Sequence, residues 1–316
     1  MDAINELQKI VGSENVLYGE SLGQYEIDPS GKYNGSSLAV VRPLNTTQVS
    51  ELVKLANELK MPIIPQGGNT GLAGGCFAGE GGDAIILSLN RMNNIREIRS
   101  DGRIAIVEGG VILSKLHDAA AKYDLIFPLF FGARGSAMIG GNLATNAGGS
   151  NVLRYGNTRD LVLGIEAVMP NGQIVDLMSE LHKDNSGYNL KHLLIGAEGT
   201  LGIITAAVVK LFPKPKAYAT AIISIPDLTY ALPILNELNK MTNNCVEAFE
   251  YMPEEYFNAL CERFEDMRQP FTKPAKHAVF LEIGAMSQED AMPDKNGNIP
   301  IEAKVENLFA DWLKSG

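Results

Sequence analysis

The chain has 316 residues, which at about 150 residues per domain predicts two domains. Hydrophobic residues make up 45% and charged residues 20%, and the mean hydropathy is -0.01, a composition typical of folded globular proteins and not of disordered or fibrous ones. The net charge of -10 argues against a general nucleic-acid binder, because such a surface repels phosphate.

The cysteines and histidines do not form a metal or disulfide pattern. The three cysteines are widely spaced, and no two of the four histidines stand at a spacing that would let one element present both to a metal. We therefore predict no metal site and no disulfide framework. The N-terminus lacks a basic segment followed by an apolar run, and no apolar stretch reaches the ~18 residues of a membrane span, so we expect a cytoplasmic protein.

The first half of the chain alternates between strands and helices after an N-terminal helical segment over residues 1–36. A helix capped by Thr46 or Thr47 should follow the first strand, because apolar residues recur there at helical spacing. We predict strands at 37–41, 61–65, 84–89 and 104–108 and a helix over 113–120.

A hairpin and a long buried strand are expected next. Residues 162–169 and 173–177 flank Asn171-Gly172, a pair that favours a tight turn between two strands. An apolar strand over 202–212 leads to Pro213 and Pro215, which cannot continue a central strand. We place the domain boundary there, with domains at 37–215 and 216–316.

The remaining segment predicts a smaller α+β domain. Strands at 219–225, 245–251 and 278–283 alternate with helices at 228–241, 254–267 and 301–314. We expect a mixed sheet covered by helices on one face, and a cap domain that is incomplete because no strand follows the last helix. Phe309 and Trp312 of that helix would then lack a partner within the chain, which would favour a homodimer.

The first of two glycine-rich runs has the properties of an anion-binding loop. Eight glycines fall between Pro65 and Gly82, and no Lys or Arg occurs from Gln66 to Gly82. Glycines allow successive backbone N–H groups to turn toward one anion, and we expect Gly71 to need a positive φ for this. The alternative is a glycine-rich packing loop. Neither a Walker loop nor a Rossmann fingerprint is present.

The second run, from Gly132 to Gly149, adds hydroxyl and amide side chains to six glycines. Ser136, Asn142, Thr145 and Asn146 can reach phosphate oxygens or the edge of a heterocycle. The alternative is a helix-capping loop with polar turn residues. Two such loops in one domain favour a long, diphosphate-containing cofactor.

These runs, with three further strings, resemble a known family. The strings at 154–157, 184–190 and 196–205 read RYGN, DNSGYNL and GAEGTLGIIT. In this order the five strings resemble the FAD-binding domain of the vanillyl-alcohol oxidase superfamily, and most closely its D-2-hydroxyacid dehydrogenase branch. The resemblance implies an α+β fold with a two-subdomain, PCMH-type FAD-binding domain, followed here by an incomplete α+β cap domain.

The resemblance also implies roles for individual residues, with FAD bound without a covalent link because Asn69 stands where relatives with a histidyl-flavin carry histidine. The first loop would hold the pyrophosphate and the second would line the flavin, with Glu198 beside them and Ile203 near the adenine. Cys76 has two interpretations, a thiol touching the cofactor or a small filler. The expected cofactor-binding residues are Gly67, Gly68, Asn69, Thr70, Gly71, Gly75, Cys76, Gly132, Ser136, Gly140, Gly141, Asn142, Thr145, Gly149, Glu198 and Ile203.

The function implied is an FAD-dependent dehydrogenase or oxidase of a D-2-hydroxyacid of the D-lactate, glycolate or D-2-hydroxyglutarate class. Electrons would pass to a quinone or an electron-transfer flavoprotein, which could bring the protein to a membrane surface. The substrate clamp and the base of relatives lie beyond the matching region, and no histidine here matches their base motif, so no catalytic residue is assigned. Two alternatives stay open: a flavin-binding module without activity of its own, and a UDP-N-acetylenolpyruvoylglucosamine reductase, against which the RYGN and DNSGYNL strings argue.

Overall fold

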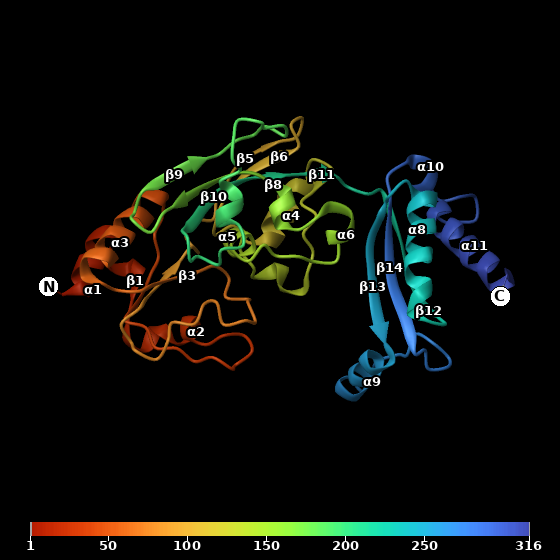
Figure 1. Ribbon diagram of the computed structural model, residues 1–316, viewed down its shortest axis with the longest axis horizontal. Coiled ribbons are helices and arrows are strands. Elements are labelled where there is room, and N and C mark those ends of the chain that lie inside the picture. The colour runs from red at the N-terminus through yellow and green to blue at the C-terminus, as the bar shows by residue number, and fades with distance from the viewer. Residues whose placement is uncertain (1, 316) are drawn as a thin grey trace. The chain divides into compact units, whose positions relative to one another are not determined.

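The computed structural model describes residues 2–315 and divides the chain into two compact units (Figure 1). The first unit comprises the chain up to Ala147 together with Asn157–Phe212. The second comprises Gly148–Gly156 together with Pro213–Gly316. Both units combine helices with sheets, so the α+β class is confirmed. Within the described residues, no helix has the length and apolarity needed to cross a membrane.

A four-stranded sheet of the first unit leads into the first glycine run. Its order is β1-β2-β4-β3, with β2, β4 and β3 parallel and β1 antiparallel to β2. The strands are β1 (Val16–Leu17), β2 (Ala39–Val41), β3 (Ile63–Gln66) and β4 (Ile85–Ser88). Both faces are buried, since alternate residues of β2 and β4 belong to two different core clusters. This explains why the strands read as continuous apolar runs.

The N-terminal segment belongs to this unit. It contains α1 (Ala3–Val11), α2 (Gly23–Glu26) and β1, and Leu7 and Val11 are buried in the core cluster that α3 (Thr46–Leu59) also joins. The cap of α3 is Asn45, whose side chain accepts from the Gln48 N–H at 2.9 Å. The prediction of a threonine cap was wrong because the Thr46 hydroxyl donates instead to Glu166 at 2.6 Å.

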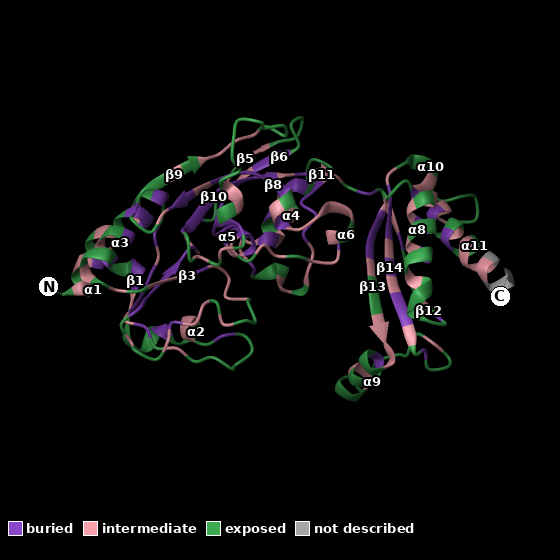
Figure 2. Cartoon of the chain, in the orientation of Figure 1, coloured by how far each residue is buried: buried purple, intermediate pink, exposed green. Residues whose placement is uncertain are grey.

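A five-stranded antiparallel sheet forms the other half of the first unit, in the order β5-β6-β10-β8-β9. Figure 2 shows β8 and β10 buried along their length. The strands of this five-stranded sheet are β5 (Ile95–Arg99), β6 (Ile104–Glu108), β8 (Val162–Val168), β9 (Ile174–Leu177) and β10 (Ile203–Lys210). The short strands β7 (Leu125–Ile126) and β11 (Phe212–Pro213) pair with each other. The helices after β6 in this unit are α4 (Leu113–Ala121), α5 (Ile139–Ala144) and α7 (Lys191–Leu194).

The second unit is a three-stranded sheet with α8 (Ala231–Thr242) and α11 (Pro300–Ser315) packed into one core with it, and with α6 (Val152–Tyr155) in contact with β13. The strands β12 (Ala217–Ile225), β13 (Val246–Pro253) and β14 (His277–Ala285) take the order β12-β14-β13. Both pairings are antiparallel, so the expectation of a mixed sheet was wrong. The two strands that run in the same direction, β12 and β13, are not neighbours, because β14 lies between them.

One core joins this sheet to its helices. It contains buried residues of α8 (Ala231–Thr242) and α11 (Pro300–Ser315), which Figure 1 shows beside the strands. Phe309 and Trp312 are partly buried against it, so the expectation that they lack a partner within the chain was wrong. The shorter helices of the unit are α6 (Val152–Tyr155), α9 (Glu254–Arg263) and α10 (Gln288–Ala291).

Candidate functional site

The two glycine runs meet backbone to backbone. A Cβ on Gly67 would lie 3.5 Å from the Cα of Gly141, and one on Gly68 would overlap the carbonyl oxygen of Ser136. No side chain fits at Gly68 without moving the second run. The glycines therefore bring the loop after β3 against the segment that contains α5.

The turn at 196–199 closes around the same place. The N–H of Gly196 donates to Leu143 at 3.0 Å, and that of Glu198 donates to Ala144 at 2.8 Å, so the turn is fixed to the end of α5. Glu198 has a left-handed φ of 51°, and one of its carboxylate oxygens lies 3.4 Å from where a Cβ on Gly75 would stand. The turn at 196–199, which opens the GAEGTLGIIT string, therefore packs between α5 and the first loop.

Several glycines of these loops face open space. A Cβ on Gly71, Gly132, Gly135 or Gly141 would meet no atom within 4 Å. Backbone groups at such positions are accessible to a ligand without a side chain in the way. The expected positive φ at Gly71 was wrong, because Asn69 and Gly74 take the left-handed conformation of this loop instead, with φ of 49° and 76°. Asn69 is held there by its side chain, which donates to the Ile27 carbonyl at 2.9 Å.

Asn142, in α5 of the second run, carries an unsatisfied donor. The residue is 4% exposed, and its Nδ2 is buried with no hydrogen-bond partner among the described residues. Buried amide nitrogens are normally paired, since an unpaired one costs about 1–3 kcal/mol. An acceptor supplied by a ligand would satisfy it.

The other predicted residues are placed as follows. Thr145 is exposed, and its hydroxyl donates to the Gly141 carbonyl at 2.9 Å. Cys76 is half-buried, and burial raises the pKa of its thiol, which favours the filler interpretation over a reactive thiolate. Ile203 is buried and opens β10 opposite Val168. Gly149 falls in the second unit.

The remaining members of the predicted set lie in the two loops. Thr70 precedes Gly71 and is half-buried, and Gly140 donates its N–H to the Gly109 carbonyl at 2.7 Å. The alternative interpretation of the second run was a helix-capping loop. The run does contain a helix, α5, but the residue before that helix, Met138, makes no side-chain cap.

Gly109 and Gly110 pack next to the site and were not predicted from the sequence. A Cβ on Gly109 would lie 2.8 Å from the Ile204 carbonyl oxygen, and one on Gly110 would overlap that of Leu89. The only signal in the sequence is two consecutive glycines directly after the buried strand β6. Their packing lets Gly140 approach the backbone of this strand.

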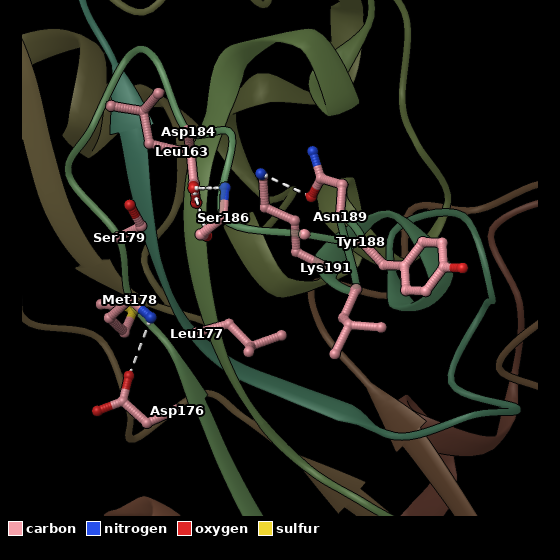
Figure 3. A pocket seen from close by; sticks show the side chains of 12 residues that line it. Leu163, Asp176, Leu177, Met178, Ser179, Asp184, Ser186, Tyr188, Asn189 and Lys191 are labelled. Carbon is pink, nitrogen blue, oxygen red and sulfur yellow. Dashed lines mark hydrogen bonds between the residues drawn. The ribbon is translucent and has the colours of Figure 1, made fainter.

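The DNSGYNL string lines a different cavity, of about 430 Å³, shown in Figure 3. No residue of the glycine loops is among those that line it. Asp184 accepts from the N–H of Ser186 at 3.0 Å, and the Lys191 ammonium donates to Asn189 at 2.8 Å. These polar groups therefore form their hydrogen bonds with one another, within residues 184–191.

Comparison with known proteins agrees with the resemblance predicted from the five strings. Residues 37–178 match the FAD binding domain family. Over 280 residues the chain is 34% identical to the mitochondrial D-2-hydroxyglutarate dehydrogenase of Arabidopsis thaliana, covering 88% of this chain and 50% of that one. Over 284 residues it is 35% identical to the D-2-hydroxyglutarate–pyruvate transhydrogenase of Saccharomyces cerevisiae, covering 89% and 57%. The chain thus spans about half the length of the curated relatives it matches.

A solved structure confirms the fold. The structure of alkyldihydroxyacetonephosphate synthase aligns with a TM-score of 0.76 at 19% identity, over 98% of this chain and 59% of that one. The family match confirms FAD as the cofactor. The residues present fit such a group, because glycine backbones face open space next to the unpaired Asn142 donor.

The expected cytoplasmic location is contradicted by the names of these relatives. The D-2-hydroxyglutarate dehydrogenases of Arabidopsis thaliana, Bos taurus and Rattus norvegicus are mitochondrial proteins by name. The prediction depended on the absence of a leader-like or membrane-spanning segment, and such an absence does not determine location.

Proposed function

We propose that this chain, whose residues 37–178 belong to the FAD binding domain family, is part of an FAD-dependent oxidoreductase that oxidises a D-2-hydroxyacid. The observation that carries the proposal is the meeting of the two glycine loops around open backbone and the unpaired Asn142 amide. The relatives, which are named for D-2-hydroxyglutarate, support this acid as the first substrate to test, with D-lactate and glycolate next.

In this proposal the first loop holds the pyrophosphate through backbone N–H groups near Gly71, since no Lys or Arg lies in residues 66–82. Gly132, Ser136 and Gly141 line the flavin, and the Asn142 amide donates to it. Asn69 provides no nucleophilic ring nitrogen, so the flavin stays noncovalent. Residues 37–215 act as the FAD-binding domain, and residues 216–316 belong to the cap.

The chemistry follows from what FAD supplies when bound, which is an acceptor for the hydride that leaves the substrate Cα. The protein must remove the hydroxyl proton and hold the carboxylate of the acid. We assign neither task to a residue of this chain. The electron acceptor of the reoxidation step is a quinone or an electron-transfer flavoprotein in this proposal.

The test is a titration of flavin-loaded protein under anaerobic conditions. Loss of the absorbance of oxidised flavin on addition of D-2-hydroxyglutarate or D-lactate, and not of the L enantiomers, supports the proposal. Stoichiometric flavin that no D-2-hydroxyacid bleaches would favour the alternative, a flavin-binding module without activity of its own. Protein that binds no FAD would refute both.

A further inference from the structure

Glu247 is a buried carboxylate in the second unit that the proposed function does not use. It is 1% exposed and lies on β13 where the pairing with β14 shifts register between Val246 and Ala248. Such a bulge adds a residue to one strand and changes where its side chain points. Burial raises the pKa of the Glu247 carboxyl, and the positive charge of Arg154 opposes this.

Three donors converge on this carboxylate. It accepts from Arg154 Nη1 at 2.6 Å, from Asn151 Nδ2 at 2.6 Å and from the Tyr155 hydroxyl at 3.1 Å. Burial and Glu247 raise the pKa of Tyr155, so this phenol keeps the proton that it donates. A buried charge with a cation and two further donors is held firmly, whereas removal of one side leaves the other without compensation.

The space for this cluster is provided by Gly284 of β14. A Cβ at that position would overlap the Glu247 carboxylate and lie 3.1 Å from Arg154 Nη1. The cluster is thus packed against the sheet as well as hydrogen-bonded to it.

All three donors lie in residues 148–156, the short segment that follows the second glycine loop. This segment leaves the first unit after Ala147 and returns at Asn157, and Thr158 donates to the Ala147 carbonyl from both N–H and hydroxyl, at 3.1 and 2.7 Å. Its two ends are therefore held together in the first unit, while Glu247 holds its middle in the second. Gly149 lies within it.

We propose that Glu247 is a positioning residue, which fixes residues 148–156 and thereby the exit of the second glycine loop for flavin binding. The part concerning flavin rests on the proposed function. The part concerning the segment does not, because it depends only on contacts within the second unit.

The experiment compares Glu247→Gln, which keeps the shape but loses the charge, with Glu247→Asp, which keeps the charge. Glu282→Gln is the matched control, since this carboxylate is on the neighbouring strand and, within the part of the chain that the structure describes, accepts one side-chain hydrogen bond, from Thr220 Oγ1 at 3.4 Å. Hydrogen exchange of the amides of residues 150–156 is measured in flavin-free protein, with the amides of β14 as internal reference. FAD affinity and the visible circular dichroism of bound flavin are measured in parallel.

We expect Glu247→Gln to speed exchange at residues 150–156 about tenfold with β14 unchanged, to weaken FAD binding about tenfold and to alter the dichroism. Glu247→Asp should recover part of each effect, and Glu282→Gln should match the wild type. Unchanged exchange at residues 150–156, or equal acceleration in β14, would overturn the positioning role. Faster local exchange with unchanged FAD affinity and dichroism would overturn the link to the flavin. If wild-type protein binds no FAD, the proposed function fails, and the exchange arm still decides the first part.

Discussion

Replacing Gly71 with valine tests the first loop as the pyrophosphate site. A Cβ there would meet no atom within 4 Å, so the substitution should leave the fold intact. If the side chain prevents two backbone N–H groups from reaching the phosphates, the loss is about 1.5–3 kcal/mol for each charge-assisted bond. At about 1.4 kcal/mol per factor of ten, FAD binding should weaken by about two to four orders of magnitude.

Two variants of the same loop separate cofactor loss from unfolding. Gly68→Ala should lower the melting temperature even without flavin, because its Cβ would overlap the Ser136 carbonyl, and overpacking of this kind costs roughly 1–3 kcal/mol. Cys76→Ser should bind FAD as the wild type does. The assay is bound flavin per chain by absorbance, with circular dichroism to check folding. Full flavin occupancy in Gly71→Val would refute the assignment of this loop to the pyrophosphate.

Three further predictions concern other residues of the first unit. Acid precipitation should release all flavin into the supernatant, because Asn69 cannot form the histidyl link; yellow colour in the pellet would contradict this. Asn142→Leu should leave the melting temperature of flavin-free protein unchanged or higher, since Asn142 Nδ2 has no partner, and should weaken FAD binding about tenfold by titration. Burial and Arg134 lower the pKa of His117, which stacks on Phe130 at 4.4 Å between ring centroids. The unfolded state therefore binds the proton more readily, and the free energy of unfolding should fall as the pH drops below about 6.5. Urea unfolding at several pH values should show a smaller dependence of this free energy on pH in His117→Gln than in the wild type. An equal dependence in both would contradict the role of His117.

Most strands of the first unit were predictable because their two buried faces make them continuous apolar runs. Strands β1 and β7, of two residues each, and β5 were not predicted. The sequence of β5, Ile95-Arg96-Glu97-Ile98-Arg99, is neither apolar throughout nor alternating. It forms at the edge of its sheet, where pairing with β6 and not burial decides the structure. In the second unit the three strands and the three longer helices were predictable from their periodicity, and the short helices α6 and α10 were not. The order of the strands was not predictable, because alternation of strands and helices does not determine which strand enters between two others.

The candidate site was predictable in composition and only partly in geometry. Glycine spacing identified both loops, but the contact of Gly68 with Ser136 joins residues far apart in the chain, which no local pattern encodes. The conformation of Gly71 was predicted wrongly for a local reason, since the Asn69 side chain bonds to Ile27 and takes the left-handed position instead. Glu247 gave no signal, because a lone glutamate in a strand is typical of an exposed position.

The excursion of residues 148–156 limits how this protein can be dissected and recombined. Neither unit is one uninterrupted stretch of chain, so a gene fragment that starts at Pro213 encodes a sheet without the arginine that balances its buried glutamate. Such a fragment should be poorly soluble on its own. Chimaeras that exchange flavin domains between relatives should likewise fold only when residues 148–156 and the sheet of β12, β14 and β13 come from the same protein.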